Sequence, residues 1–266
     1  MRDDTLFFRS GDVYDALIIS DLHLGARVCR AAELLALLKA IEGELIHTRS
    51  LVLNGDVFDS IDFRRLRRQH WNILSTFRRL SKHTRIVWVC GNHDGPAEVV
   101  SHLLGVDVAD EHVVHSAGER MLVLHGHTFD DFIDEHPVMT LFADGIYRLL
   151  QLIDRSHGVA RRAKYGSKTF LRCVEKVRDG ATAYAAMRGF RAVSCGHTHH
   201  ASVEEANGVR YYNSGCWTER PCTLLTVMNG NTQLHTFESF LASWPVMMIA
   251  EENGIDVPVP IIDNAA

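Results

Sequence analysis

Five short polar clusters in this sequence contain residue types that bind divalent metal ions. Each cluster directly follows a short apolar run. The clusters are Asp21-Leu22-His23, Gly55-Asp56-Val57-Phe58-Asp59, Gly91-Asn92-His93-Asp94, His125-Gly126-His127 and Gly196-His197-Thr198-His199. Carboxylate and amide oxygens and neutral imidazole nitrogens suit Mn²⁺, Fe²⁺, Zn²⁺ or Co²⁺. Because the clusters contain no thiolate, a structural zinc site built on cysteines is disfavoured.

The apolar runs before these clusters predict buried strands. The runs are Ala16 to Ser20, Leu51 to Asn54, Ile86 to Cys90, Met121 to Leu124 and Ala192 to Cys195. An amphipathic helical pattern separates the first two runs, and this β-helix-β order favours parallel strands joined by a right-handed crossover. A second helix is predicted from about Asp62 to Leu80, and the segment 97–118 is predicted to be irregular. Ligands of open α/β sheets bind at the carboxyl ends of the strands. We therefore expect the five clusters to meet at one edge of a sheet.

The clusters offer more metal ligands than one tetrahedral ion can use. The candidate ligands are Asp21, His23, Asp56, Asn92, His125, His197 and His199. Such a set suits two ions about 3.5–4 Å apart that share a bridging carboxylate. Asp56 is the predicted bridge, since it is the middle carboxylate of the set and directly follows a glycine. Two such ions would stabilise phosphoryl oxygens and activate a water for in-line attack on phosphorus.

His93 and Asp94 are the predicted catalytic residues outside the ligand set. His93 could donate a proton to the leaving oxygen, and Asp94 could fix its tautomer. Asp59 would then contact the ligand side chains without binding an ion itself. The segment Asn213-Ser214-Gly215-Cys216-Trp217 is interpreted as core and turn.

The order of these motifs resembles that of the calcineurin-like metallophosphoesterase superfamily. This resemblance implies an α/β fold, a four-layer α-β-β-α sandwich, with two divalent ions at its site. It also implies ligand roles. Asp21, His23, Asp56 and His199 would hold one ion, and Asp56, Asn92, His125 and His197 would hold the other. His93 matches the catalytic histidine of the family.

A narrower resemblance, over residues 17–227, is to the UDP-2,3-diacylglucosamine hydrolases and their relatives. It rests on Ser20 to Gly25, the arginine-rich stretch after Asp59, Phe129-Asp130 after the fourth cluster, and Cys195 to His200. It implies cleavage of a nucleotide-linked glycolipid to UMP and a lipid sugar 1-phosphate in lipid A synthesis, with a helical cap over the acyl chains. One branch of those enzymes has arginine at the position of His93, so the match is to the other branch. His127 stands where an aspartate is expected.

Residues 1–266 are predicted to form a single domain with a helical lid insertion at 130–190. The alternation of strands and clusters stops after His127 and resumes at Ala192, and apolar helical patterns fill the gap. Arg161, Lys164 and Lys168 lie in this segment, where they could contact substrate phosphates or be solvated. A lid at the active edge of a sheet is one interpretation, and a pair of covering helices is the other.

Composition sets the limits on localisation and partners. The 266 residues carry a net charge of −5 with histidine neutral, so no nucleic-acid partner is expected. The N-terminus lacks a signal-peptide pattern, and no apolar run is long enough to cross a membrane. Six cysteines without a Cys-x-x-Cys motif suit a reducing cytoplasm. We expect a cytoplasmic protein with peripheral contact to the inner membrane. The sequence carries no signal for an oligomeric state.

Three functions are consistent with these features. The first is hydrolysis of UDP-2,3-diacylglucosamine with two divalent ions, for which manganese is expected. The alternative is a soluble phosphodiesterase or phosphatase acting on nucleotides or other small phosphoesters. The third is a non-catalytic scaffold of the same fold, which the complete ligand set and His93 disfavour. Asp59-Ser60-Ile61 replaces the Asp-Arg-Gly of the phosphoprotein phosphatases, which argues against that branch.

Overall fold

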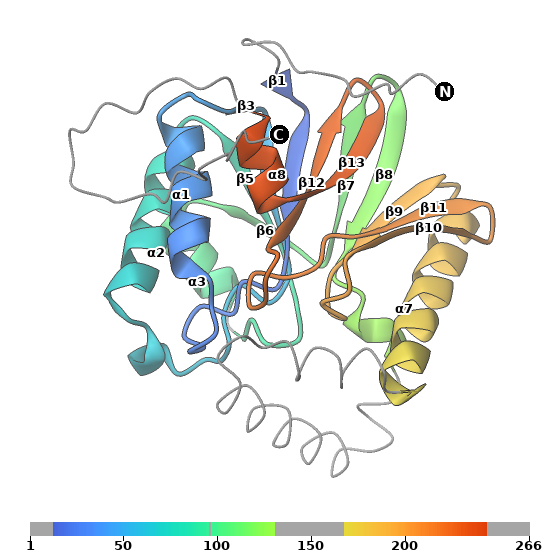
Figure 1. The fold of residues 1–266 in the computed structure, drawn as a ribbon, viewed down its shortest axis with the longest axis horizontal. Coiled ribbons are helices and arrows are strands. Elements are labelled where there is room, and N and C mark those ends of the chain that lie inside the picture. Colours follow the sequence, from blue (N-terminus) through green and yellow to red (C-terminus); the bar gives the residue numbers. More distant parts are fainter. Residues whose placement is uncertain (1–12, 96, 131–167, 244–266) are drawn as a thin grey trace, which may run out of the picture.

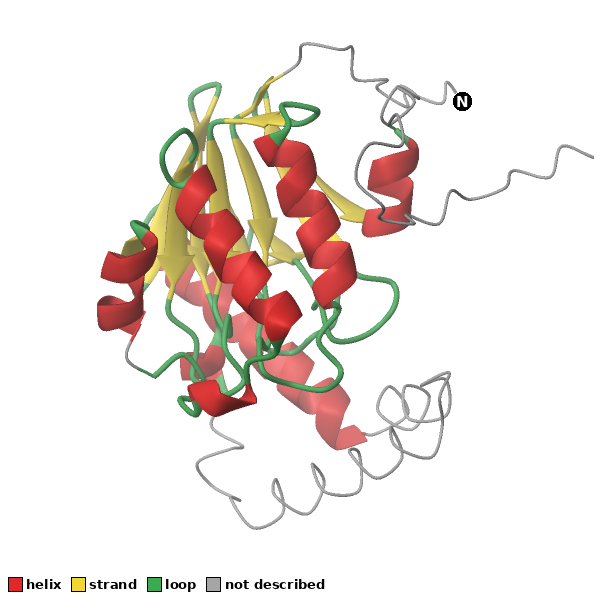
Figure 2. Ribbon diagram, turned by 90° about the vertical axis from the view of Figure 1, so that its left-hand side faces the viewer, coloured by secondary structure: helices red, strands yellow, loops and turns green. Residues whose placement is uncertain are grey.

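The computed structural model describes residues 13–95, 97–130 and 168–243. These residues form two β-sheets packed face to face, with helices on both outer sides (Figures 1 and 2). One outer layer contains α1 (Ala31–Glu42), α2 (Arg68–Leu80) and α3 (Ala97–Leu104), and the other contains α7 (Lys168–Met187). The described chain is therefore a four-layer α-β-β-α sandwich, which confirms the predicted fold class.

The six-stranded sheet has the order β13-β12-β2-β4-β5-β6. Its strands are β2 (Ala16–Ile19), β4 (Ser50–Asn54), β5 (Arg85–Val89), β6 (Asp107–Ala109), β12 (Thr223–Met228) and β13 (Asn231–Thr236). The four strands from β2 to β6 are parallel, as the β-helix-β pattern predicts, whereas β12 runs antiparallel to β2. A short strand β1 (Val13–Tyr14) pairs with β3 (His47–Thr48).

The five-stranded sheet has the order β10-β11-β9-β8-β7. Its strands are β7 (Glu111–Ser116), β8 (Glu119–Leu124), β9 (Ala192–Cys195), β10 (Ser202–Ala206) and β11 (Val209–Asn213). The central strands β8, β9 and β11 are parallel. The segments that follow them therefore leave the sheet at one common edge.

Successive side chains of each strand point to opposite faces of its sheet, which divides the hydrophobic core into three parts. Leu17 and Ile19 of β2 pack toward the helices α1 and α2, and Ile18 packs between the two sheets. Leu122 and Leu124 of β8 pack toward α7. Because both faces of these central strands are covered, their sequences are continuous apolar runs rather than alternating ones.

Two segments differ from the sequence predictions. We expected an irregular segment at 97–118, but it contains α3, β6 and β7. The half-buried pattern of β7 hides its strand character, since only Val114 and Ser116 are fully buried. We also expected one helix from Asp62 to Leu80. The structure instead has a 3-10 turn η1 (Phe63–Arg65), an extended Leu66, and α2 beginning at Arg68.

The predicted lid range 130–190 contains an outer layer of the sandwich. Helix α7 buries Val174, Val177 and Ala181 and contacts β9 and β11. This part of the range therefore matches the covering-helix interpretation. Lys168 is the exposed first residue of α7, whereas Arg161 and Lys164 lie outside the described residues.

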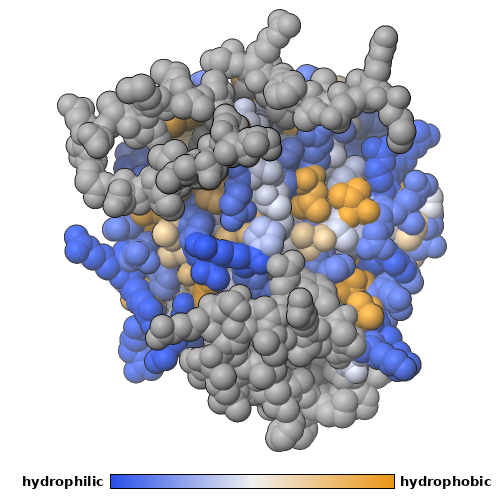
Figure 3. Space-filling view, viewed as in Figure 1, coloured by the Kyte–Doolittle hydropathy of each residue, from blue (hydrophilic) through white to orange (hydrophobic). Residues whose placement is uncertain are grey.

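The described surface is mainly hydrophilic on the face shown in Figure 3. Three arginines of the basic stretch after the second cluster form ion pairs nearby: Arg64 with Asp62, Arg65 with Asp59, and Arg79 with Glu42. In the described ranges, no helix is both long and apolar enough to span a membrane.

Candidate metal centre

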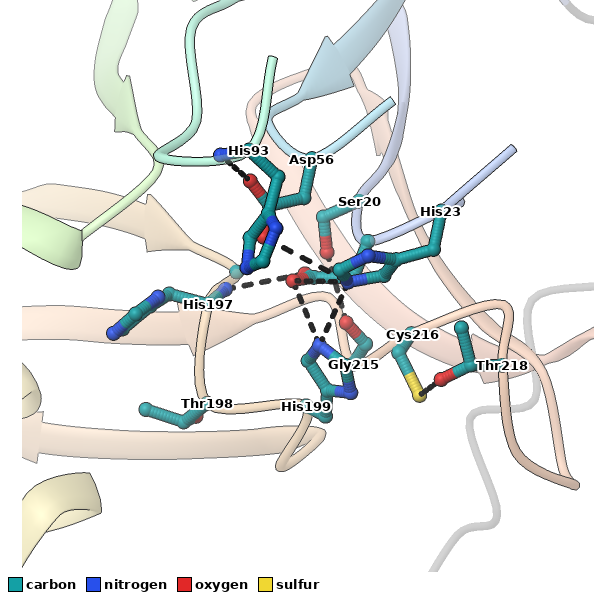
Figure 4. Close-up of polar contacts among 12 residues, drawn as sticks. Ser20, His23, Asp56, His93, His197, Thr198, His199, Gly215, Cys216 and Thr218 are labelled. Carbon is teal, nitrogen blue, oxygen red and sulfur yellow. Dashed lines mark hydrogen bonds and ion pairs between the residues drawn. The ribbon is translucent and has the colours of Figure 1, made fainter. Parts of the chain in front are cut away.

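The clusters after β2, β4, β8 and β9 meet at one edge of the sandwich. Figure 4 shows His23, Asp56 and His199 from three of these clusters. Asp21 Oδ1 lies 3.1 Å from His199 Nε2, and His23 Nε2 lies 3.2 Å from the same nitrogen. Asp56 Oδ2 lies 3.7 Å from His23 Nε2, and its Oδ1 lies 3.5 Å from His125 Nε2. The fold thus brings these five predicted ligands together from distant parts of the sequence.

Their ligand atoms form two overlapping groups. One contains Asp21, His23 and His199, the other contains Asp21, Asp56 and His125, and within each group the atoms lie within 4.8 Å of one another. Asp56 directs one oxygen toward a histidine of each group, which is the arrangement expected of a bridging carboxylate. Asp21 belongs to both groups, so the two carboxylates lie side by side in the middle.

Several ligand residues have left-handed backbone conformations that side chains with a Cβ rarely adopt. The φ angles are 53° at Asp21, 47° at His23, 51° at Asp56, 63° at His197 and 56° at His199. Neighbouring clusters hold these conformations through backbone hydrogen bonds. Asp21 N donates to Gly55 O at 3.0 Å, and His23 N donates to Asp56 O at 2.9 Å. Backbone strain is therefore concentrated where the ligands converge, as is common at functional sites.

Two glycines make room for ligands of other clusters. A Cβ at Gly55 would overlap the ring of His125, and a Cβ at Gly91 would overlap the carboxylate and backbone nitrogen of Asp56. Both overlaps are too close for any real side chain. These glycines therefore serve the packing of the centre rather than a turn alone.

The donor atoms fit a divalent cation. Asp21 Oδ1 and His125 Nε2 are buried, and within the described part of the chain neither has a hydrogen bond of good geometry, although Asp21 Oδ1 lies close to His199 and His125 Nε2 lies close to Asp56. Leaving such an atom unsatisfied costs about 1–3 kcal/mol, and a cation would satisfy both. His125 Nδ1 lies 2.8 Å from Asn54 O and donates there, so the ring would present an Nε2 lone pair to a bound cation once Nε2 loses its proton.

Electrostatics also favour a cation. Burial and the positive charge of His199 lower the pKa of His23 to about 4, which keeps this ring neutral. Burial opposes protonation of His125 as well, but Asp56 and Asp21 raise its pKa to about 9. Burial would raise the pKa of Asp56, yet the positive charge of His125 and its side-chain hydrogen bond hold the pKa of Asp56 below its ordinary value. The two carboxylates thus create a negative field that attracts positive charge.

His197 is held by a carboxylate outside the two groups. Its Nε2 lies 3.0 Å from Oδ2 of the buried Asp130, and its backbone nitrogen donates to Asp21 Oδ2 at 3.1 Å. An Nε2–H donated to Asp130 leaves Nδ1 as the nitrogen that can bind a metal. Cys173 of α7 also donates to Asp130 Oδ2, at 3.1 Å. Asn92 is exposed on the loop that also carries His93.

Asp94 makes different hydrogen bonds from those we predicted. Its buried carboxylate accepts from the backbone nitrogens of Asp56, Val57, Phe58 and Gly91 and from the indole of Trp88, at 2.7–3.1 Å. It therefore holds the Asp56 loop rather than the His93 ring. His93 is exposed, and its Nδ1 lies 3.3 Å from the backbone oxygen of Asp59. A buried carboxylate with N–H donors along two loops is a positioning residue.

Residues 15–231 match the model for the calcineurin-like phosphoesterase superfamily domain. The chain belongs to this superfamily. The donor set described above is consistent with the metal-binding phosphoesterase fold that this family match identifies.

Among curated proteins, the chain is similar to the DNA polymerase II small subunit of Thermoplasma acidophilum, with 26% identity over 234 residues. That match covers 75% of this chain but 44% of the relative, so the chain spans less than half of that protein's length. Among solved structures, it is similar to Yfce, a phosphoesterase from E. coli, with 14% identity, coverage of 84% and 93%, and a TM-score of 0.47. A novel archaeal phosphodiesterase has 15% identity, coverage of 83% and 98%, and a TM-score of 0.43. The family match therefore carries the assignment.

Some neighbours of the centre were not predicted as site residues. No site role is predicted for Asp130, which is part of the motif Phe129-Asp130, and the segment with Cys216 is interpreted as core and turn. The structure places Cys216 and Glu219 beside His199. The available signal was local: Ser214-Gly215-Cys216 follows β11 just as the five polar clusters follow their strands. Asp59 was expected behind the ligands, and its carboxylate lies 3.7 Å from His23 Nδ1 and pairs with Arg65.

Proposed function

We propose that this protein hydrolyses phosphodiester or pyrophosphate bonds with two divalent ions. The observation that carries the proposal is Asp56, whose two oxygens face histidines of both ligand groups. Asp21, His23, Asp56 and His199 would hold one ion, and Asp56, Asn92, His125 and His197 would hold the other. Bound ions would supply Lewis-acid stabilisation of the phosphoryl oxygens and lower the pKa of water. Manganese suits this set of oxygen and nitrogen donors.

His93 is the residue we assign to proton transfer. Its exposed ring lies at the rim of the centre, with its centroid 5.3 Å from that of His23. Donation from Nδ1 to the Asp59 carbonyl would leave Nε2 available to the leaving oxygen. The backbone nitrogen of His93 donates to Asp56 Oδ1 at 3.0 Å, which fixes the distance between the proton donor and the bridge (Figure 4).

Substitution of His93 tests this division of roles. His93→Ala should keep its metal ions but lose roughly 10²- to 10⁴-fold in turnover of a chromogenic phosphodiester, the usual scale for a general acid. His83→Ala, at an exposed position after α2, is the matched control. If activity in His93→Ala instead follows a loss of bound metal, His93 is a ligand and its assignment is wrong.

For the substrate, we propose the pyrophosphate of UDP-2,3-diacylglucosamine, cleaved to UMP and a lipid sugar 1-phosphate at the cytoplasmic face of the inner membrane. The support is the motif resemblance over residues 17–227. We further propose that the insertion at 130–190, of which residues 131–167 lie outside the described ranges, contributes a lid. Arg161 and Lys164 of this segment, with Lys168 at the start of α7, would contact the phosphates.

A substrate panel separates this proposal from the alternative. The manganese-loaded protein should release UMP from the diacylated UDP-glucosamine, and replacing Arg161, Lys164 and Lys168 by alanine should raise the KM for this substrate. If the protein hydrolyses cyclic or linear nucleotides efficiently but leaves the acylated substrate intact, the lipid proposal fails. The alternative, a phosphodiesterase of small phosphoesters, then stands with the same metal centre.

A further inference from the structure

His199 stands between the metal centre and a second group of metal-binding side chains. One of its nitrogens, Nε2, faces Asp21 and His23 at 3.1 and 3.2 Å. A separate group consists of His199, Cys216 and Glu219, whose ligand atoms also lie within 4.8 Å of one another. Figure 4 shows Cys216 on the opposite side of His199 from His197. The histidine is therefore shared by two potential sites.

The turn that carries Cys216 is fixed to the ligand loops. Trp217 N donates to Asp21 O at 3.1 Å, and Ser20 Oγ donates to Gly215 O at 2.8 Å. Thr218 Oγ1 lies 3.3 Å from Cys216 Sγ and donates to it, which suits a sulfur that carries negative charge. The position of the thiol relative to the centre is thus set by the fold.

Two members of the second group are buried, His199 is half-buried, and there is space beside them. The exposed fraction is 4% for Cys216 and 7% for Glu219. A cavity of about 280 Å³ is lined by these two residues together with His199, Arg220 and other residues of the 199–223 segment. This volume is large enough for an ion with water molecules completing its coordination.

We propose that His199, Cys216 and Glu219 form an inhibitory site for a thiophilic divalent ion such as Zn²⁺. Imidazole nitrogen, thiolate sulfur and carboxylate oxygen are the ligands that Zn²⁺ uses in proteins, and water from the cavity supplies the fourth. A thiolate selects Zn²⁺ over Mn²⁺, which prefers oxygen. This inference rests on the proposed function, because it requires His199 to serve the catalytic centre.

Inhibition follows from the chemistry of the imidazole. A neutral ring has one nitrogen lone pair, since the other nitrogen carries a proton. Whichever nitrogen the second group uses, His199 can serve only one of the two ions at a time. Binding of Zn²⁺ beside Cys216 displaces the thiol proton to solvent and withdraws His199 from the catalytic centre. The catalytic ion held by Asp21 and His23 then loses a ligand and dissociates more readily.

Cobalt titration provides a test that does not depend on turnover. Co²⁺ bound to a thiolate has a charge-transfer absorption band, which the thiolate-free catalytic centre does not produce. Titrating Co²⁺ into the manganese-loaded protein should produce this band, release one equivalent of Mn²⁺ and inhibit hydrolysis in parallel. Excess Mn²⁺ should reverse all three effects.

Cys216→Ser should abolish the band, and Glu219→Gln should weaken Co²⁺ binding by about 10- to 100-fold. Cys222→Ser, which changes another buried thiol of the same segment, is the matched control and should retain the band.

No band in the parent protein, or a band that persists in Cys216→Ser, overturns the proposal. Should Cys216→Ser fail to fold, Glu219→Gln decides, because unchanged Co²⁺ affinity in this variant contradicts the site. Hydrolysis without a band refutes this inference only, and a band without phosphodiester hydrolysis refutes the proposed function only.

Discussion

The two edges of the sandwich use the same unusual backbone conformation for different reasons. At the edge opposite the centre, three hairpin turns have positive φ angles: Ala117-Gly118, Asn207-Gly208 and Asn229-Gly230. Added Cβ atoms at Gly118 and Gly208 would meet no atom of the described structure within 4 Å. Asparagine and glycine tolerate this conformation, so local propensity selects it at 207–208 and 229–230, whereas in the first turn only Gly118 is favoured and Ala117 is strained. We call this edge the hairpin edge.

At the metal edge, aspartate and histidine adopt the left-handed conformation while buried. Each such residue costs roughly 1–2 kcal/mol. The cost is offset by contacts from other loops, such as the hydrogen bonds that the Asp94 carboxylate accepts from the backbone of the Asp56 loop. The backbone conformation of a hairpin turn is therefore determined mainly by its own residues. At the metal edge, segments far apart in sequence determine it jointly.

The largest expected effect is that of removing the shared ligand. Asp56→Ala should lose both ions and reduce hydrolysis to background, because its two oxygens face both ligand groups. His23→Ala should weaken mainly one ion. Asn207→Ala, at the hairpin edge, is the control and should keep full metal content. Metal analysis of the purified variants measures this, and retention of both ions in Asp56→Ala would refute the bridging role.

A pair of glycine substitutions compares the two edges directly. Gly91→Ala should displace Asp56 and lose metal binding, because the added methyl overlaps its carboxylate. Gly118→Ala should cost only the roughly 1–2 kcal/mol of a left-handed alanine and leave metal binding intact. Urea denaturation with metal analysis would measure both effects. Equal metal affinity in the two variants would show that the metal edge does not depend on this close packing.

The sequence predicted the strands and the meeting of the clusters because both follow local rules. The runs ending before Asp21, Asp56 and His125 are apolar because both sheet faces are covered, and their carboxyl ends share one edge. The approach of Asp130 to His197, and of Cys216 to His199, depends on how the two sheets and α7 pack. No pattern within a single segment encodes such contacts.

Asp94 shows a second reason why the structure differs from the sequence prediction. Proximity in sequence suggested that it would hold the neighbouring His93. Its carboxylate instead satisfies several backbone N–H groups that the left-handed Asp56 loop leaves unpaired, and this requirement became visible only with the loop conformation. The segment 97–118 differed from prediction because its strand β7 is half exposed and lacks a clear apolar alternation.

Asp130 allows a smaller perturbation of the metal edge. Asp130→Ala should lower the affinity for one ion by about 10- to 100-fold, the usual cost of losing a carboxylate that orients a metal-binding histidine. Asp130→Asn should recover part of this loss, since its amide oxygen can still accept from His197. Isothermal titration with Mn²⁺ measures the two affinities. A uniform loss at both ions would instead indicate a general structural role for Asp130.

The smallest expected effect is a pH dependence of the metal-free protein. The pKa of His125 is about 9 in the folded state, because Asp56 and Asp21 outweigh the effect of burial, against about 6.5 in an unfolded chain. A raised folded pKa gives stability that is fully present below about pH 6.5 and is lost as the pH rises through 9. Between pH 6.5 and 7.5 this amounts to about 1 kcal/mol.

Urea denaturation of the chelated protein between pH 6.5 and 7.5 measures how the free energy of unfolding changes with pH. His125→Gln should reduce this change. His115→Gln, an exposed histidine near the hairpin edge, is the control. Bound divalent ions should reverse the dependence, because they replace the proton as the positive charge beside Asp21 and Asp56 and require a deprotonated ring. A metal-free protein whose stability rises from pH 6.5 to 7.5 would show that these carboxylates do not hold His125 in its charged form. The negative field inferred at the metal edge would then be absent.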